Sequence, residues 1–520
     1  MTPPALTLSL TPRPAGIDVE YTVQEPALIP DQVLCRLPIL IAGVPGAPIG
    51  AAELTVTDAD GAVPLREEDE PPSPSIRYRR WYPTRDTAGD VTVGYFAPVR
   101  QVDTTTKNGP LFDLRSEAGG VSGAGVTFLA LPESDRDYAI TLRWDGVSSL
   151  GEGTVELTGP VDRLAYGFYL AGPLKRYPED ETSSLKTYWL DEPAFDIHEV
   201  AARSLHIYEV MCDFFREPSP GHRVFVRKHP YRGNGGTALL RSFTFGWNAA
   251  DVPEVDDLSD LLAHEIAHNW PSLDGEHGET AWYSEGCAEY YSIVLSHRAG
   301  LIDDAEFLER VNERARAYYT NPLQTLSNQQ AAEVFWQDAR AQRVPYGRGF
   351  FYLVDLNAKI LAASGGARSV DDLVLAVVER RRAGDKVGVA DWVRLVTDEL
   401  GDQGQTDFAA LQAGEWMVPG AEAFGPRFTR REVTAHTTEL GFDLKSLETR
   451  VVNGLVPESA AARAGVREGD RLAQAPAEGD LARGRVKEIT LTLDRGEHTI
   501  DVAYPAAGTP VRSFRWELSG

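Results

Sequence analysis

Cysteine is scarce in this sequence, and that scarcity excludes one class of protein. Only 3 of the 520 residues are cysteines, and Cys35, Cys212 and Cys287 lie far apart. A small, odd number of widely spaced thiols does not fit the disulfide framework that stabilises small secreted domains. We therefore expect a chain without a disulfide scaffold.

Long apolar runs are also missing. No stretch reaches the roughly 20 apolar residues that a membrane-spanning helix requires. The first residues, Met1–Ala5, lack the basic and apolar segments of a secretory signal. These absences predict a cytoplasmic protein with no membrane span.

Positive charge is in short supply as well. The 51 Lys and Arg residues are outnumbered by 77 Asp and Glu, which gives a net charge of −26. Because binding to nucleic acid requires a basic surface, we do not expect a nucleic-acid partner. The remaining composition is that of an ordinary globular protein, and 520 residues are too many for one hydrophobic core.

The most informative stretch that is present is His264-Glu265-Ile266-Ala267-His268. Apolar residues at helical spacing around it predict a helix that ends before Pro271. On a helix, two histidines four residues apart lie on the same face and can supply two ligands to one metal ion. A catalytic zinc takes three protein ligands and leaves a position for water, and Glu265 is placed to act on that water as a general base.

A second predicted helix, from Thr280 to Leu295, supplies candidates for the third ligand. Glu285 is separated from His268 by 16 residues, a distance that a loop and a returning helix can span. His277 is the rival, although its spacing differs from that of the HExxHxxGxxH class. Glu289, one turn after Glu285, is placed to accept the outer N–H of a ligating histidine, with a surface carboxylate as the alternative.

These motifs resemble those of the gluzincin peptidases, and in particular those of the glycyl aminopeptidase family. The similarity extends to Tyr346-Gly347-Arg348-Gly349, which is similar to a Tyr-x-Lys-Gly segment of that family. The resemblance implies a zinc metallopeptidase with one Zn²⁺ per chain, peptide substrates, and Tyr346 as a residue that stabilises the transition state. It also implies a thermolysin-like, mainly helical catalytic domain.

One expected glutamate is missing from the stretch that resembles the family's Gly-Gly-x-Glu-x substrate-binding strand. Here that stretch is Gly235, Gly236, Thr237 and Ala238, so alanine stands where the family's glutamate binds the substrate's free amino group. An alanine side chain cannot hold an ammonium group. Glu279 and Glu289 are candidates for a substitute carboxylate.

The last hundred residues resemble a PDZ domain. Leu440, Gly441 and Phe442 lie in a stretch similar to the carboxylate-binding loop and the strand after it, which implies a C-terminal peptide as a possible ligand. Further along, Ser459 is expected to cap a short helix that ends at Gly465, and a strand is expected to begin at Arg471. The alternative is a PDZ-shaped packing module that binds nothing.

Together these observations predict a multidomain α+β fold with four parts. Strand patterns such as Leu6–Leu10, Val91–Phe96 and Tyr138–Trp144 predict an N-terminal antiparallel β domain over residues 1–170. The expected parts that follow are a zinc-binding catalytic domain (171–300), a helical domain that completes the cleft (301–420) and the PDZ domain (421–520). Helices are expected at Glu199–Phe215, Ala305–Tyr319 and Phe350–Ala363.

Three functions are compatible with these residues. The first is a zinc metallopeptidase, aminopeptidase-like, that uses a metal-activated water. The second is a zinc hydrolase or endopeptidase that does not require a free amino terminus, which Ala238 would permit. The third is a catalytically idle PDZ scaffold. The intact set of site residues argues against it: His264, Glu265, His268, Glu285 and Tyr346.

Overall fold

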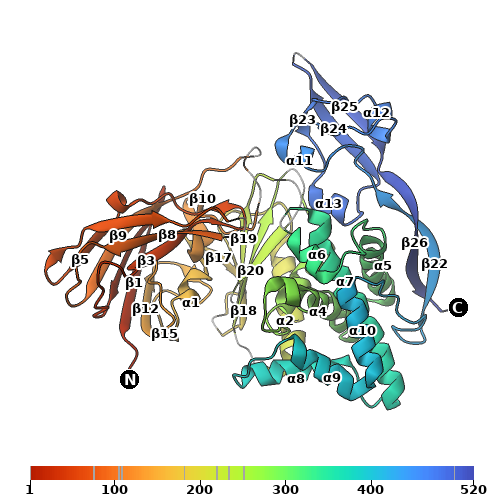
Figure 1. Cartoon of the computed structure of the whole chain (residues 1–520), viewed down its shortest axis with the longest axis horizontal. Coiled ribbons are helices and arrows are strands. Elements are labelled where there is room, and N and C mark those ends of the chain that lie inside the picture. Colours follow the sequence, from red (N-terminus) through yellow and green to blue (C-terminus); the bar gives the residue numbers. More distant parts are fainter. Residues whose placement is uncertain are drawn as a thin grey trace. The chain divides into compact units, whose positions relative to one another are not determined.

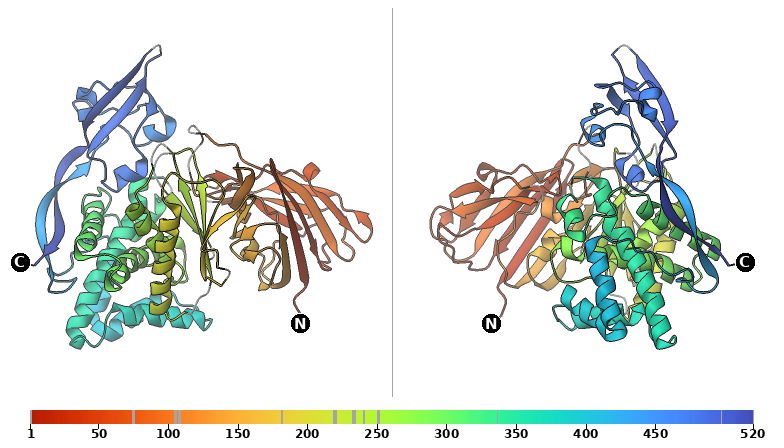
Figure 2. Two further views of the ribbon diagram at one scale, coloured as in Figure 1. Left: turned by 180° about the vertical axis from the view of Figure 1, so that it is seen from behind. Right: turned by 45° about the vertical axis from the view of Figure 1, so that its right-hand side comes forward.

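The structure is a computed structural model (Figure 1). It describes residues 2–73, 76–103, 106, 109–180, 182–217, 221–231, 235–239, 241–249, 252–335, 337–496 and 498–519. The chain separates into two compact units, one formed by Met1–His206 with Ser219–Ser259 and the other by Ile207–Pro218 with Asp260–Gly520. The predicted multidomain α+β class is confirmed, with β-sheet domains first, then a helical region, and a C-terminal β region (Figure 2). The four predicted domain boundaries stay predictions.

The first unit begins with two sheets that share one hydrophobic core. The larger has the order β15-β12-β1-β2-β9-β5-β6 and the smaller the order β4-β3-β8-β7. Their strands are β1 (Ala5–Arg13), β2 (Gly16–Val23), β3 (Cys35–Ile41), β4 (Val44–Pro45), β5 (Thr55–Asp58), β6 (Gly61–Ala62), β7 (Leu65–Asp69), β8 (Ile76–Pro83), β9 (Val91–Pro98), β12 (Tyr138–Trp144) and β15 (Val155–Gly159). The three strands expected from sequence lie within β1, β9 and β12.

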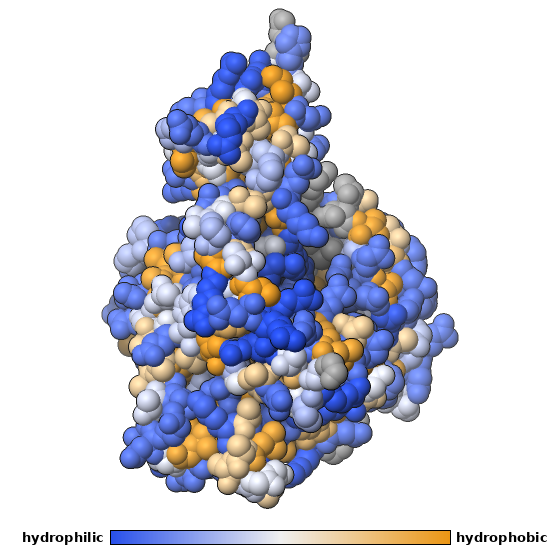
Figure 3. Space-filling view, turned by 90° about the vertical axis from the view of Figure 1, so that its right-hand side faces the viewer, coloured by the Kyte–Doolittle hydropathy of each residue, from blue (hydrophilic) through white to orange (hydrophobic). Residues whose placement is uncertain are grey.

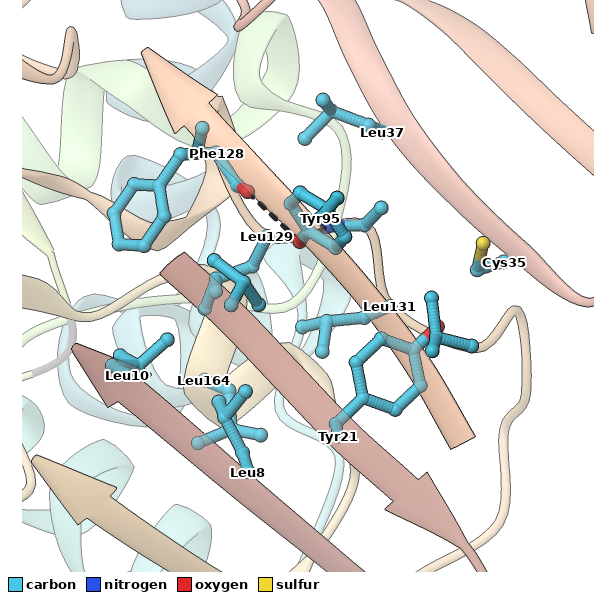
Figure 4. Packing of buried hydrophobic residues seen from close by; sticks show 14 of the residues in the cluster. Leu8, Leu10, Tyr21, Cys35, Leu37, Tyr95, Phe128, Leu129, Leu131 and Leu164 are labelled. Atoms are coloured by element: carbon cyan, nitrogen blue, oxygen red, sulfur yellow. Dashed lines mark hydrogen bonds between the residues drawn. The ribbon is translucent and has the colours of Figure 1, made fainter. Parts of the chain in front are cut away.

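Alternating leucines explain how β1 contributes to this core. Leu6, Leu8 and Leu10 point to one side of the strand and are buried, because successive side chains of a strand alternate between its faces. Figure 4 shows Leu8 and Leu10 in this packing, together with Tyr95. The buried Tyr95 hydroxyl donates a hydrogen bond to the Phe128 carbonyl at 3.0 Å, so its polar atom is satisfied.

The N-terminal domain is not wholly antiparallel, which corrects the prediction. Strand β1 pairs with β12 in parallel, with Ala5 opposite Ala139 and Leu10 opposite Trp144. The other pairings of the large sheet are antiparallel. A parallel pair joins segments that are distant in the sequence, so no local turn pattern announces it.

Two five-stranded sheets complete the first unit. One has the order β10-β11-β16-β13-β14 and the other the mixed order β17-β18-β19-β21-β20. Their strands are β10 (Arg115–Glu117), β11 (Gly120–Ala124), β13 (Val147–Ser148), β14 (Gly151–Glu152), β16 (Phe168–Ala171), β17 (Lys175–Tyr177), β18 (Leu185–Trp189), β19 (His222–Lys228), β20 (Gly235–Leu239) and β21 (Ser242–Trp247). Short helices are η1 (Ala51–Glu53), η2 (Gly125–Thr127) and α1 (Asp162–Ala165), and α2 (Ile197–Phe214) connects the parallel strands β18 and β19.

Helices dominate the second unit up to residue 413. They are α4 (His277–Arg298), α5 (Asp304–Tyr319), α6 (Asn328–Glu333), α7 (Ala339–Ser364), α8 (Val370–Arg382), α9 (Val389–Leu400) and α10 (Asp402–Ala413), and α3 (Val255–Ala267) leads into them. The predicted helices near α2, α4 and α5 are confirmed to within a few residues. Helix α7 begins 11 residues before the expected Phe350 and contains Pro345, a residue that normally disfavours a helix interior.

The C-terminal region combines a two-stranded ribbon with a small sheet. Strands β22 (Phe428–Thr438) and β26 (Ala507–Leu518) form the ribbon, and β23 (Arg471–Gln474), β24 (Glu488–Asp494) and β25 (Thr499–Pro505) form the sheet. The ribbon lies beside α5 (Figures 1 and 2), where the Asn312 side chain exchanges two hydrogen bonds with the backbone of Trp516 at 2.7 and 2.9 Å. Short helices α11 (Ser446–Thr449), α12 (Ala460–Arg463) and α13 (Glu478–Ala482) complete the region.

The PDZ resemblance is met in part by these elements. Ser459 caps α12 by accepting from the Ala462 N–H, Gly465 follows with φ +96°, and β23 begins at Arg471, as expected. However, the prediction of a strand directly after the carboxylate-binding loop is wrong. Residues 439–445 form no strand, and the short helix α11 follows them.

The three residues predicted to bind a peptide, Leu440, Gly441 and Phe442, take part in the packing of the domain itself. Leu440 and Phe442 are buried in the core of the small sheet. Gly441 has φ +85°, and a Cβ there would come within 2.8 Å of Ala461, so glycine is required by both backbone and packing. A PDZ domain is therefore not shown by this fold.

The surface is polar on the face drawn in Figure 3, with hydrophobic side chains scattered over it. Large exposed hydrophobic residues are few among the described residues: Ile29, Phe96, Leu174, Val252, Leu361, Val456, Ile500 and Leu518. Within the part of the chain that the structure describes, no helix has the length and apolar character needed to cross a membrane.

Candidate metal centre

Helix α3 places the two histidines of the motif. His264 lies in its last turn, and His268 follows directly after the final residue, Ala267. The two rings face each other edge to face at 4.9 Å, and their Nε2 atoms are 3.2 Å apart. Two ring nitrogens this close can share a proton, or they can direct both lone pairs at one metal ion.

Helix α4 brings Glu285 to the same point. Its Oε2 atom lies 3.3 Å from the His264 Nε2 and 3.4 Å from the His268 Nε2. That oxygen is buried and has no hydrogen-bond partner among the described residues. These three are the group of potential ligands that the described residues assemble.

The ligand spacing fits zinc. Tetrahedral zinc with bonds of about 2.0–2.1 Å to N and O ligands has ligand atoms about 3.3–3.4 Å apart. The three distances between ligand atoms in this site are 3.2, 3.3 and 3.4 Å. Two nitrogens and one oxygen are also the donor set of many catalytic zinc sites.

The charges around the site favour a cation. Burial opposes charge on the His268 ring, but Glu285, Glu265 and Glu289 outweigh it and raise the pKa of His268 to about 9. Burial would raise the pKa of Glu285, yet His268 and His264 hold that pKa well below its usual value. The site therefore has an excess of carboxylates around two imidazoles, which a divalent metal ion balances.

Glu265 has a different environment from the ligands. Burial raises its pKa, and Glu285 adds to this effect, while His264 and His268 oppose it. A carboxylate with a raised pKa is a stronger base than an ordinary one and accepts a proton more readily. This environment suits a general base.

A buried ion-pair network that was not predicted holds Glu289. Its Oε1 lies 3.6 Å from the His264 Nδ1, and its Oε2 accepts from the Arg314 Nε at 2.6 Å. Arg314 also binds Asp260 at 2.6 Å, and Asp260 is paired with Arg310 at 3.2 Å. Because α3, α4 and α5 each contribute to this network, it fixes the helices that carry the ligands. In the sequence, Arg310 and Arg314 are four residues apart, and so are Asp260 and His264. This spacing indicates that each pair lies on one face of its helix.

Helix α7 places Tyr346 beside the histidines. Its ring lies parallel to the His264 ring, with centroids 5.7 Å apart. Burial and the neighbouring Glu285 raise the pKa of Tyr346 well above its usual value, so the hydroxyl keeps its proton and remains a donor. Arg343, one helical turn earlier, places its guanidinium carbon 4.6 Å from the centre of the same ring.

Two glycines allow α4 and α7 to approach closely. A Cβ on Gly286 would come within 2.5 Å of the Gly349 Cα, and a Cβ on Gly349 would come within 1.9 Å of the Trp282 carbonyl oxygen. Only glycine fits at this crossing. Because Glu285 and Tyr346 lie next to it on the two helices, the crossing sets their separation.

The other predicted site residues lie elsewhere or have other contacts. His277 is outside the ligand group, and its ring packs edge to face on Phe335 at 4.8 Å. Glu279 is exposed on the first turn of α4, and Glu289 is bound to Arg314. Neither Glu279 nor Glu289 is therefore a free carboxylate in the site that could bind the substrate's amino group in place of the glutamate missing at Ala238.

The predicted substrate-binding stretch belongs to the first unit, as the edge strand β20. Thr237 accepts a hydrogen bond from the Leu111 N–H at 2.9 Å, and a Cβ on Gly236 would collide with the Phe243 ring at 1.9 Å. Gly235 and Ala238 are half-buried, and Ala238 pairs with Phe243 in the antiparallel register with β21.

Comparison with known proteins agrees with this geometry. Residues 274–346, which contain Glu285 and Tyr346, match the M61 glycyl aminopeptidase family. No curated protein sequence matches the chain significantly. The fold is similar to that of an aminopeptidase N family protein from Idiomarina loihiensis, with 14% identity, a TM-score of 0.68, and coverage of 99% of this chain and 98% of the other.

Two further solved structures are more distantly similar. One is an M1 zinc metallopeptidase from Deinococcus radiodurans, a mutant bound to a Tyr-Ser-Ala substrate, with 17% identity, a TM-score of 0.49, and coverage of 80% and 95%. The other is yeast LTA4 hydrolase, with 11% identity, a TM-score of 0.48, and coverage of 80% and 68%. The family match and the His264, His268 and Glu285 cluster together identify this chain as a zinc metallopeptidase of the gluzincin type.

Proposed function

We propose that the chain hydrolyses peptide bonds near the amino terminus of its substrates, with one zinc ion held by His264, His268 and Glu285. The observation that carries this proposal is the triangle of three ligand atoms, 3.2–3.4 Å on each side. Zinc bound there would act as a Lewis acid on the scissile carbonyl and lower the pKa of a water molecule.

The chain's own residues would divide the remaining chemistry. Glu265 takes a proton from the attacking water at its carboxylate and passes it to the leaving amine. Tyr346 keeps its proton and donates a hydrogen bond to the oxygen on which negative charge develops. Glu289, held by Arg314, orients the His264 ring from its Nδ1 side.

Substrate selection at the amino terminus is weaker in this proposal than in a strict aminopeptidase. A buried ammonium group needs a carboxylate or several acceptors, and Ala238 supplies neither. Peptides with blocked amino termini are therefore expected to be substrates too.

The experiment compares a peptide with its N-acetylated form on the zinc-loaded chain. The proposal predicts values of kcat/KM for the two that differ by less than about ten-fold, that is, by less than about 1.4 kcal/mol. If acetylation abolishes cleavage, another group binds the amino terminus and the proposed weak selectivity is wrong. The Ala238→Glu variant is expected to sharpen the preference for free amino termini.

An endopeptidase or other zinc hydrolase is the second candidate, and Ala238 is the observation that favours it. It predicts cleavage inside long peptides blocked at both ends.

Binding of a C-terminal peptide by the region around Leu440, Gly441 and Phe442 also stays a prediction, to be tested by calorimetric titration with free and amidated peptides.

A further inference from the structure

Two arginines without a counter-ion lie together beside the proposed catalytic residues. Arg343 stands on α7 and covers the Tyr346 ring at 4.6 Å. Arg483 follows α13 in the C-terminal region and is half-buried. Neither side chain forms an ion pair or a hydrogen bond with any residue that the structure describes, whereas Arg310, Arg314 and Arg485 are all paired.

The position of Arg483 is fixed by contacts on both sides of it. Helix α13 packs on α7, as Figure 1 shows. On the near side, the Glu478 carboxylate accepts from the Ala339 N–H at the start of α7, at 3.4 Å. On the far side, Arg485 pairs with Glu313 of α5. Arg483 lies between these two anchors and is therefore held against the catalytic helices.

The two guanidinium groups are close enough to repel each other. Arg343 is the largest cause that lowers the pKa of Arg483, to about 9, and burial adds to it. Asp480 and Glu289 oppose this shift without compensating it, and Glu289 is already bound to Arg314 at 2.6 Å. Two unpaired cations that repel each other are unfavourable unless an anion lies between them.

We propose that Arg343 and Arg483 form a carboxylate-binding subsite that selects peptides with a negative charge near the scissile bond. This proposal rests on the proposed peptidase function and names its substrate class. Guanidinium groups bind carboxylates through paired N–H donors, and Arg343 would bring such a carboxylate to the side of Tyr346. The carboxylate comes either from the C-terminus of a short peptide or from an Asp or Glu side chain.

Because the protein as a whole is acidic, a preference for acidic peptides would indicate a local basic site. A chain with a net charge of −26 repels acidic peptides at long range. A preference for acidic substrates therefore has to come from a local site.

The test uses the full zinc-loaded chain and two pairs of peptides. The first pair is Ala-Ala-Ala-Ala with a free C-terminus and its C-terminal amide. The second is the amides of Ala-Ala-Asp-Ala and Ala-Ala-Asn-Ala. For at least one pair, kcat/KM is expected to be about ten-fold or more higher for the charged member. Which pair responds identifies the source of the carboxylate.

Variants then assign the preference to the arginines. In Arg483→Gln the ratio of kcat/KM between charged and neutral members is expected to fall towards one. The ratio compares two peptides on the same protein, so partial unfolding does not change it. The matched control is Arg471→Gln, an exposed arginine of β23 with no side-chain partner among the described residues, and it should keep both the ratio and the activity.

Two results would overturn the subsite. One is equal kcat/KM for charged and neutral members of both pairs, and the other is an unchanged ratio in Arg483→Gln. Failure of the chain to cleave any peptide would refute the proposed function instead, so the two failures are distinguishable.

Discussion

At the scale of single residues, the carboxylates of the metal centre differ in their partners. Of those that the structure describes there, Glu285, Glu289 and Asp260 are each paired with a histidine or an arginine, and Glu265 has no such pair. An unpaired carboxylate with a raised pKa is free to exchange protons.

The first prediction concerns this carboxylate. In Glu265→Gln, kcat should fall by at least about a hundred-fold, because an amide cannot accept the proton. The zinc content should stay at the wild-type value, because the ligands are intact. Kinetics and metal analysis on one preparation check both points, with the exposed Glu309→Gln as control. A turnover near that of the wild type would rule out the general-base role.

The second prediction concerns Tyr346. Loss of one donor to the developing oxyanion typically lowers kcat by about a hundred- to a thousand-fold, so Tyr346→Phe should do this with little change in KM. A purely structural tyrosine would instead lower stability and leave the activity of each folded molecule unchanged. Active-site titration of the folded fraction separates the two results.

At the scale of elements, the crossing of α4 and α7 controls the site. The third prediction is that Gly349→Ala forces the helices apart, because its Cβ would meet the Trp282 carbonyl oxygen at 1.9 Å. Overpacking of this kind costs about 1–3 kcal/mol of the free energy of unfolding. It should also lower kcat, since Glu285 and Tyr346 lie on the separated helices.

The control for this variant is Gly479→Ala, since a Cβ at Gly479 has no described atom within 4 Å. Urea unfolding and kinetics of both variants check the prediction. Equal stability and equal kcat in the two would show that the crossing does not set the geometry of the site.

The fourth prediction concerns the ion pairs that connect α3, α4 and α5. Arg314→Gln leaves Glu289 without its partner in a buried place and removes one of the two cations at Asp260. Loss of one member of a buried pair costs about 3–5 kcal/mol. The free energy of unfolding should fall accordingly, while the exposed Arg316→Gln on the same helix should change it little. Equal values for the two variants would contradict this role.

Sequence alone could predict elements with a local signal. Helical spacing predicted that His264 and His268 share a face, and the 16 residues before Glu285 predicted its return on α4. The earlier start of α7 has no such local signal, because Pro345, which normally disfavours a helix interior, lies inside this part of the helix. The i,i+4 spacing of Arg310 and Arg314 places them on one helix face but does not say which carboxylates they meet, and Arg483 has no local pattern at all, because long-range packing chooses these neighbours.

At the scale of the whole molecule, the same limit applies to the sheets. The parallel pairing of β1 with β12 joins Ala5 to Ala139, far beyond the reach of any turn signal. The chain nonetheless has the fold of the Idiomarina loihiensis protein over 99% of its length at only 14% identity.

The fifth prediction is the central one, that a single zinc ion at His264, His268 and Glu285 makes the chain a peptidase. The most direct measurement follows zinc content and peptide hydrolysis in one preparation, before chelation, after it, and after zinc is returned. We expect one zinc per chain, loss of hydrolysis with the metal, and recovery with one equivalent of zinc, whereas His264→Ala should neither hold zinc nor recover. Full hydrolysis by the metal-free chain, or stoichiometric zinc in His264→Ala, would contradict the account.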